Sequence, residues 1–301
     1  MRAASICCGL IALGLTSSGA RAELYYLIVS GLGGEQRYAE RFEVQAESLA
    51  QAAQRSLGGD ARVSLLSGDG ATRESLTAEL ERLAQVITAT DSLAVFLIGH
   101  GTHDGELYKY NLPGPDIDGE TLASLLNAVP ASRQVVVNAT SASGAVLESW
   151  FGEGRTLITA TRSGGERNAT RFGGHWTAAL SSDEADANRN GAITVQEAFD
   201  YTARKVADSY ESEGLLATEH PQLVGETGSF NVALLEERVA TTEELERLLA
   251  ELDALEGEVA ALRQSRDGMD NDVYLDALQE LLLELALVQR QIDEARASSE
   301  P

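Results

Sequence analysis

Cysteine is nearly missing from this sequence. Its two cysteines, Cys7 and Cys8, both lie within the first 22 residues, where an apolar run over 3–15 follows Arg2 and precedes Ala20-Arg21-Ala22. This pattern predicts a signal peptide, residues 1–22, cleaved near Ala22. A chain processed there contains no thiol, which excludes disulfides, thiolate metal sites and a cysteine nucleophile. We expect an exported protein, periplasmic or extracellular.

Basic residues are also scarce. The sequence has 23 Lys and Arg against 47 Asp and Glu, a net charge of −24. Such a surface repels nucleic acid and anionic membranes and attracts cations, so nucleic acid is not an expected partner. Beyond the N-terminal segment, no stretch reaches the roughly 18 consecutive apolar residues of a membrane helix, and we expect no stable membrane span.

The rest of the chain alternates between two patterns. Short apolar runs, typical of buried strands, occupy residues 23–30, 61–67, 91–101, 133–140 and 155–161. Helical spacing of apolar residues occupies 35–56, 71–90 and 119–129. This alternation predicts an α/β domain over residues 23–235, with a mainly parallel sheet covered by helices on both faces.

Residues 239–301 have a different pattern. Apolar residues recur at spacings of three and four, typical of a coiled-coil seam, first from Leu245 to Leu262 and then at Leu275, Leu278, Leu282, Leu285, Val288 and Ile292. A polar stretch separates the two stripes, which predicts an antiparallel helical hairpin. Leu281, Leu283 and Leu287 fall outside the second stripe and indicate a further contact surface, with self-association as one use.

Two of the predicted strands end in residues that can do chemistry. The run DSLAVFLIGHG ends at His100-Gly101, and RQVVVNATSASG ends with hydroxyls at Thr140, Ser141 and Ser143. Ligands gather beyond the carboxyl ends of neighbouring parallel strands, so these ends form a candidate site. A helix predicted to start near Ala145 would add free amides that favour an anion beside Thr140 and Ser143.

The order of these two motifs resembles the caspase- and legumain-like cysteine peptidases, over roughly residues 23 to 235. His100-Gly101 matches the motif of the catalytic His. Thr140-Ser141-Ala142-Ser143-Gly144 matches the Ala-Cys-x-Ser-Gly turn, with Ser141 in place of the nucleophilic Cys. The resemblance implies a three-layer caspase-like fold. It also implies that the loop after residue 161 lines the substrate pocket, through Arg162, Glu166 and Arg171.

A second motif is the 12-residue stretch DANRNGAITVQE, Asp186 to Glu197. An EF-hand calcium loop has oxygen donors at positions 1, 3, 5, 9 and 12, Gly at 6 and a backbone carbonyl at 7. The residues in register are Asp186, Asn188, Asn190, Gly191, Ala192, Thr194 and Glu197. Only two are carboxylates, which predicts weak binding, with a Kd on the order of 10⁻⁴ to 10⁻³ M. We interpret one Ca²⁺ here as a structural staple.

Three functions fit this sequence. The first is an exported, catalytically inactive peptidase homologue that binds peptides or proteins in the former substrate cleft. The second is an active hydrolase with Ser141 as nucleophile and His100 as general base, although the nearest acids, Asp104 and Glu106, do not stand in an obvious triad order. The third is a scaffold that acts through the hairpin over 239–301.

Overall fold

The structure is a computed structural model that describes residues 22–227, 230–235, 243–266 and 269–299. The predicted signal peptide lies outside these residues, apart from Ala22. Among the helices that are described, none is both long enough and apolar enough to cross a membrane.

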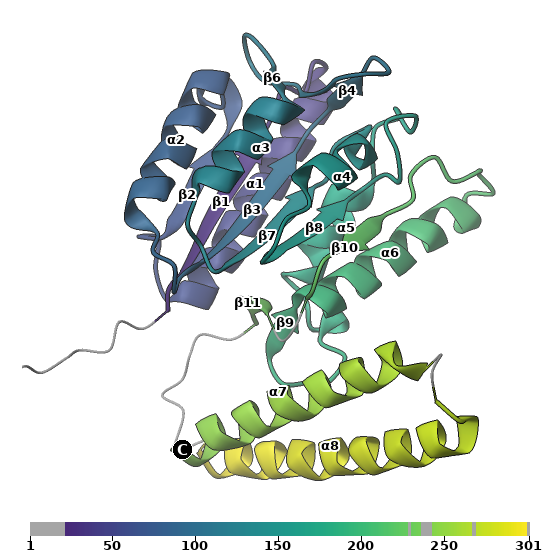
Figure 1. The fold of residues 1–301 in the computed structure, drawn as a ribbon. Helices are drawn as coiled ribbons and strands as arrows, with labels where there is room; N and C mark the ends of the chain where they lie inside the picture. The colour runs from purple at the N-terminus through teal and green to yellow at the C-terminus, as the bar shows by residue number, and fades with distance from the viewer. Residues whose placement is uncertain (1–21, 228–229, 236–242, 267–268, 300–301) are drawn as a thin grey trace, which may run out of the picture.

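A six-stranded sheet forms the centre of the molecule, in the order β10-β8-β7-β3-β1-β2 (Figure 1). Its first five strands in the chain are parallel, and β10 pairs antiparallel with β8 at one edge. Their bounds are β1 Leu24–Ser30, β2 Val63–Leu66, β3 Ser92–Ile98, β7 Arg133–Asn138, β8 Arg155–Thr159 and β10 Gln222–Val224. The central strands are nearly continuous apolar runs because helices cover both faces.

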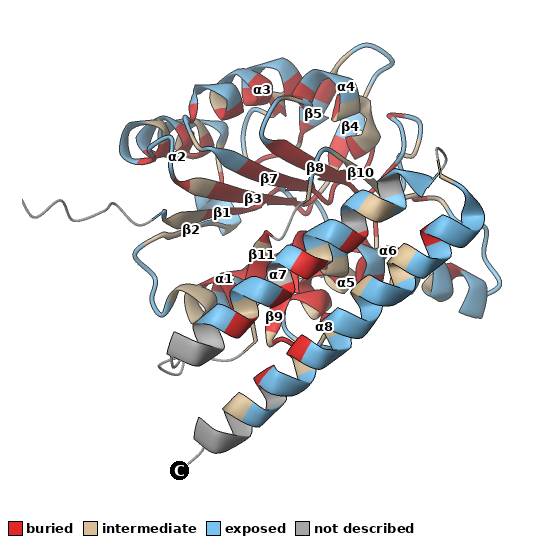
Figure 2. Ribbon diagram, turned by 60° about the horizontal axis from the view of Figure 1, so that its bottom comes forward, coloured by how far each residue is buried: buried red, intermediate tan, exposed pale blue. Residues whose placement is uncertain are grey.

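Helices bury the two faces separately, and alternate residues of each strand supply the two cores. One core holds Ile28, Phe96 and Val137 with residues of α1 Gln36–Leu57, α5 Phe172–Ala179 and α6 Val195–Ser212. The other holds Val29, Val95 and Val136 with α2 Arg73–Val86, α3 Gly119–Ala128 and α4 Leu147–Trp150. Figure 2 shows the buried sheet between these layers. The predicted α/β class, with a mainly parallel sheet, helices on both faces and a C-terminal helical hairpin, is confirmed.

Two small sheets flank the main one. The strands β4 Gly101–His103, β5 Tyr108–Tyr110 and β6 Ile117–Asp118 form an antiparallel sheet directly after β3. The strands β9 Ala192–Thr194 and β11 Asn231–Leu234 pair antiparallel and form a separate two-stranded sheet, with β9 directly before α6. Short 3-10 turns lie at η1 Gly68–Gly70, η2 Ser143–Val146 and η3 Asp183–Ala185.

The C-terminal helices α7 Glu243–Gln264 and α8 Asn271–Ser299 pack on each other around Leu248, Leu252, Leu255, Val288 and Ile292. The stripe predicted on the second helix is wrong in its N-terminal half. Leu275 and Leu282 are 51% and 47% exposed, whereas Tyr274 is buried and Leu281 packs against the core. The packed side of α8 follows alternating steps of four and three residues back from Ile292, through Val288, Leu285 and Leu281 to Tyr274. The sequence also has apolar residues at the positions of the predicted stripe, so spacing alone does not choose between the two.

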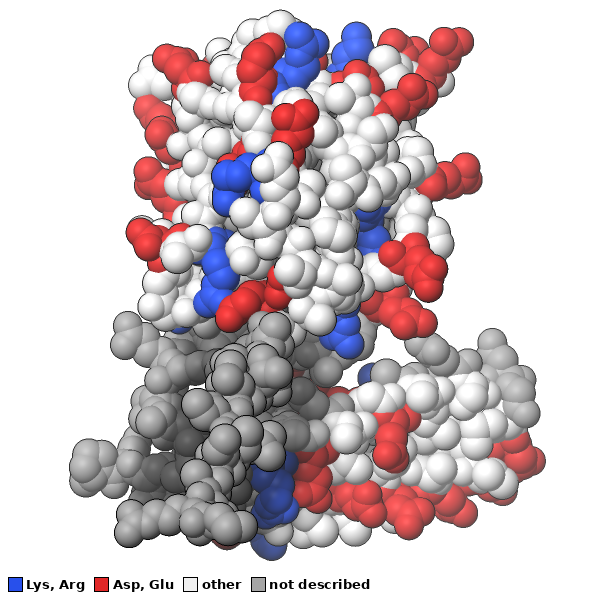
Figure 3. Space-filling model, turned by 60° about the vertical axis from the view of Figure 1, so that its left-hand side comes forward, with Lys and Arg blue, Asp and Glu red and all other residues white. Residues whose placement is uncertain are grey.

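Acidic side chains dominate the surface. Figure 3 shows Asp and Glu spread over one face of the α/β domain and along the hairpin, with fewer Lys and Arg between them. On α8, Leu283 and Leu287 remain exposed, as does Leu275.

Candidate functional site

The strands β3 and β7 are neighbours, and their register places Leu97 opposite Asn138. His100 and Ser141 each follow this pair by three residues, so both lie at the carboxyl edge of the sheet. We call the loops after β3, β7 and β8 at this edge the rim.

The His100 ring at the rim lies against helix α1. Its centroid is 4.9 Å from the Tyr38 ring and 5.1 Å from the Phe42 ring, both edge-on. Burial and then the positive charge of Arg41 lower the pKa of His100, partly offset by a backbone hydrogen bond to Gly33. Within the described residues, this imidazole makes no hydrogen bond to Ser141 or to an acid, and Glu35 raises its pKa only through its charge. The ring therefore packs against aromatic side chains, in a position that lowers its pKa.

We expect His100 to titrate below the ordinary value of about 6.5, because burial and Arg41 both disfavour the imidazolium. A folded pKa below the unfolded one means that the stabilising contribution is present above about pH 6.5 and is lost as the pH falls through the folded value. Arg41→Met should raise the pKa of His100, measured by NMR of the ring protons, while Arg82→Met should leave it unchanged. A wild-type pKa at or above 6.5 would contradict this placement.

The hydroxyls after β7 lie below the rim surface. Thr140 is fully buried, and its Oγ1 lies 2.6 Å from the Tyr108 hydroxyl and 2.8 Å from Asn138 Oδ1. Ser141 is 2% exposed. Gly101 packs directly against the Ser141 backbone, since a Cβ at Gly101 would lie 2.4 Å from the Ser141 carbonyl oxygen. Glycine after His100 is therefore required by close packing of β4 on the end of β7.

Ser143 ties the turn after β7 to the end of β8. Its Oγ lies 3.2 Å from Thr161 Oγ1 and accepts a hydrogen bond from Thr161 N, and Thr161 Oγ1 in turn accepts one from Gly144 N. Ala142 adopts a left-handed conformation, with φ 56°. Its N–H donates to the Glu166 carbonyl at 2.7 Å, so the loops after β7 and β8 form one connected unit.

The structure brings Arg162 and Glu166 together at the rim. Arg162 Nε lies 3.0 Å from Glu166 Oε1, and the arginine side chain is 62% exposed against 11% for the glutamate. Glu166 also accepts from His220 N and lies 2.5 Å from His220 Nδ1. Arg162 is thus an accessible charge of this loop, as is Arg167, and the ion pair with Glu166 orients the Arg162 guanidinium.

Arg171 makes different contacts. Its guanidinium pairs with Glu213 at 2.7 and 2.8 Å and lies 4.3 Å from the centre of the Tyr210 ring. No described contact joins it to Arg162 or Glu166. Its backbone N–H donates to Glu219, a carboxylate that is 2% exposed.

The sequence did not indicate two neighbours of this site, Arg41 and Glu219, and indicated a third, His103, only as a turn residue. Arg41 sets the charge beside His100, and Glu219 organises the start of α5. The ring of His103 fills the space beside Gly164, where a Cβ would lie 2.4 Å from Nδ1. Arg41 is one of several charged residues in α1, and Glu219 lies in a loop. The sequence around them therefore does not indicate that either lies near the site.

The predicted calcium loop folds with its side-chain oxygens turned toward its own backbone. Asp186 Oδ1 and Asn188 Oδ1 both accept from Asn190 N at 3.0 Å, so these two oxygens lie close together. Thr194 and Glu197 form a reciprocal cap at the start of α6, and Glu197 Oε1 accepts from Ala187 N. Ala192 begins β9, which pairs with β11 instead of with a second such loop.

No cluster of three or more His, Cys, Asp or Glu side chains able to hold a metal is found among the described residues. The loop does not depend on such a cluster, because amide, hydroxyl and carbonyl oxygens supply most of its donors. Hard cations such as Ca²⁺ accept all of these oxygen types. The residues present therefore fit Ca²⁺, with Asp186 and Glu197 as the two charged donors.

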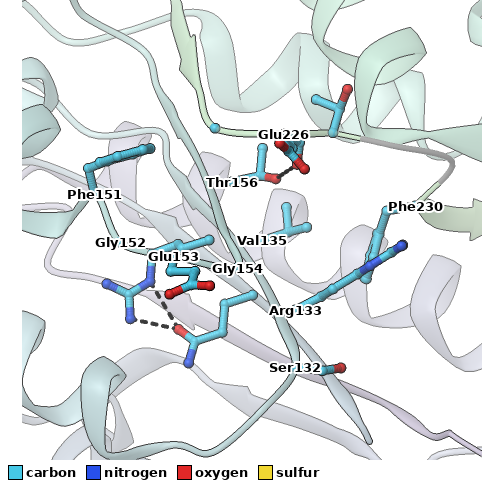
Figure 4. A pocket seen from close by; sticks show the side chains of 14 residues that line it. Ser132, Arg133, Val135, Phe151, Gly152, Glu153, Gly154, Thr156, Glu226 and Phe230 are labelled. Carbon is cyan, nitrogen blue, oxygen red and sulfur yellow. Dashed lines mark hydrogen bonds between the residues drawn. The ribbon is translucent and has the colours of Figure 1, made fainter. Parts of the chain in front are cut away.

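A cavity of about 520 Å³ lies at the opposite edge of the sheet (Figure 4). It is lined by the starts of β7 and β8 and by residues around Glu226. Two of the buried polar side chains in its wall, Arg155 and Gln134, already bond each other at 2.8 and 3.0 Å. A third, Thr156, donates to the Glu226 carbonyl oxygen. This cavity is separate from the rim.

Comparisons with known proteins give only structural similarity. No protein-family model matches the chain. No curated protein sequence matches it either. Among solved structures, a protein from Geobacter sulfurreducens is similar over 71% of this chain and 99% of its own, with 14% identity and a TM-score of 0.47. The Drosophila initiator caspase Dronc is similar over 70% of this chain and 81% of its own, with 10% identity and a TM-score of 0.45. At these values the likeness carries no conclusion about activity or ligand.

Proposed function

We propose that the chain is an exported caspase- or legumain-like peptidase homologue that binds peptide or protein segments at the rim without hydrolysing them. One observation carries the proposal: Ser141 is 2% exposed, and the His100 ring is packed on Tyr38 and Phe42. A general base has to reach the proton it removes, at roughly 2.6–3.2 Å. The pattern of the first 22 residues supports export as part of this proposal.

The rim still offers groups that can bind a peptide. The exposed guanidinium of Arg162 can donate to a carboxylate or a main-chain carbonyl, and Glu166 fixes its direction. Thr140 and Ser143 support the surface from below, since both are fully buried and bonded within the protein. The ligand class that fits is an extended peptide with an acidic side chain, because Arg162 offers an exposed cation.

Arg162→Ala should weaken peptide binding by about threefold to tenfold, within the range for the net contribution of one typical hydrogen bond. The measurement is fluorescence polarisation of a labelled random hexapeptide mixture with the full chain. Arg133→Ala is the matched control, because Arg133 is also exposed but starts β7 at the opposite edge of the sheet. Equal losses in both variants, or no binding by wild type, would refute the proposal.

A second candidate, an active serine hydrolase, is favoured by the matching register that puts His100 and Ser141 each three residues past the pair Leu97 and Asn138. This candidate requires the ring or the hydroxyl to move into contact. A fluorophosphonate that labels the wild-type chain but not Ser141→Ala would support it.

We also propose that the loop Asp186–Glu197 binds one Ca²⁺ as a structural staple. The support is the complete set of oxygen donors and the left-handed conformations at Arg189 and Gly191, which turn the loop sharply. With two carboxylates, the expected Kd lies toward 10⁻⁴ to 10⁻³ M, roughly the range of extracellular calcium modules.

A further inference from the structure

The calcium loop contacts the C-terminal hairpin. Asn188 Nδ2 donates to Glu256 Oε1 of α7, and Gln289 Nε2 of α8 lies 3.5 Å from the Arg189 carbonyl oxygen. Both helices of the hairpin therefore reach the middle of the same loop, at positions 3 and 4. Figure 1 shows the hairpin beside β9 and β11, at the opposite end of the molecule from β4 and β6.

Asn188 has a different role at each end of its amide. Its Oδ1 faces the loop, where it shares the Asn190 N–H with Asp186, while its Nδ2 donates to Glu256. An aspartate at this position would turn a carboxylate toward Glu256 and repel it. The third position of the loop is therefore chemically suited to join the calcium site to α7.

The net charge is negative on both sides of this contact. Helix α7 carries seven Asp and Glu and two Arg, and the loop carries Asp186 and Glu197 against Arg189. The hairpin has its own apolar core, separate from the two cores of the α/β domain. Among the described residues, the hairpin meets the loop through the contacts of Asn188 with Glu256 and of Arg189 with Gln289. A bound Ca²⁺ would offset the net negative charge beside them.

We propose that calcium bound in the loop Asp186–Glu197 fixes the hairpin α7–α8 against the α/β domain through Asn188 and Glu256. This inference rests on the proposed calcium site and is independent of peptide binding at the rim. Calcium binding and docking of the hairpin are thermodynamically linked. If bound calcium stabilises the Glu256 contact, that contact must increase the affinity for calcium by the same factor.

The first test is calorimetric titration of the full chain with calcium chloride. Glu256→Ala should lower calcium affinity by about threefold to tenfold, the range for loss of one hydrogen bond and its coupling. Glu258→Ala is the control, because it removes the same charge from an exposed position on the same helix. Equal affinities for the two variants would overturn the coupling while leaving the calcium site intact. No calcium binding by wild type would overturn both.

The second test reads the hairpin directly. In wild type, calcium should slow amide hydrogen exchange around Glu256 as well as in the loop. In Glu256→Ala the slowing should be confined to the loop. Calcium protection of the loop alone in wild type would overturn the proposal, even if the calcium affinities agree with it.

Discussion

Replacing Gly144 by alanine is expected to destabilise the protein by about 3 kcal/mol, because the new methyl group would overlap backbone that has no room to move. A Cβ at Gly144 would lie 2.2 Å from Ser163 N and 2.5 Å from the Thr161 carbonyl oxygen. These atoms belong to the loop after β8, so the substitution should separate the two loops that Ser143 and Thr161 hold together. Urea denaturation of the full chain measures the effect.

Gly152→Ala is the matched control, since nothing lies within 4 Å of a Cβ built there. Its effect should stay within about 0.5 kcal/mol, as for most surface changes. If the two glycine variants unfold at the same urea concentration, close packing of the rim loops is not what requires Gly144. Close packing also accounts for the glycine of the His100-Gly101 motif. A Cβ at Gly101 would lie 2.4 Å from the Ser141 carbonyl oxygen and 2.7 Å from the Tyr108 ring.

Removing the carboxylate of Glu219 should cost about 3 kcal/mol, because two backbone N–H groups and a tyrosine hydroxyl would lose an acceptor that is 2% exposed. Its oxygens accept from Arg171 N, Phe172 N and the Tyr210 hydroxyl. Glu219→Ala should therefore loosen the start of α5, whereas Glu213→Ala removes an exposed ion pair and should cost under about 1 kcal/mol. Thermal or urea unfolding of both variants measures the difference.

The pH dependence gives a further check on Glu219. Burial raises the pKa of this carboxyl, with the backbone hydrogen bonds acting in the opposite direction. A raised folded pKa means that the stabilising contribution is fully present below the unfolded value and is lost as the pH rises through the folded one. The stability difference between wild type and Glu219→Ala should therefore narrow as the pH rises above about 4.5, the ordinary pKa of a glutamate. A widening gap would contradict burial as the dominant cause.

The sequence predicts the layered fold well because the signals are local. The runs that became β3 and β7 are apolar throughout, and helical spacing defines α1 and α2. The edge strands β10 and β11 were not predicted, since three or four residues are too few for a periodic signal. The predicted second stripe of the hairpin was wrong in its N-terminal half because Tyr274 and Leu275 are adjacent apolar residues, as are Leu281 and Leu282. Either member of each pair fits a helical spacing.

The candidate site was predictable in position but not in orientation. Parallel strand order brings His100 and Ser141 to one edge, as the motif order suggested. Whether the imidazole faces Ser141 or helix α1 depends on Tyr38 and Phe42, which lie about sixty residues earlier in the chain. The contact between Asn188 and Glu256 is equally non-local. Such tertiary contacts leave no trace in local spacing.

The most direct test of the central claim is mass spectrometry of a defined peptide mixture incubated with the full chain and calcium chloride. Wild type, Ser141→Ala and Ser141→Cys are compared. Because the His100 ring packs on Tyr38 and Phe42 and makes no described hydrogen bond to Ser141, we expect it to activate neither a hydroxyl nor a thiol at this position. All three proteins should therefore leave the peptides intact. Cleavage products that form with wild type and disappear with Ser141→Ala, or that appear with Ser141→Cys, would contradict it.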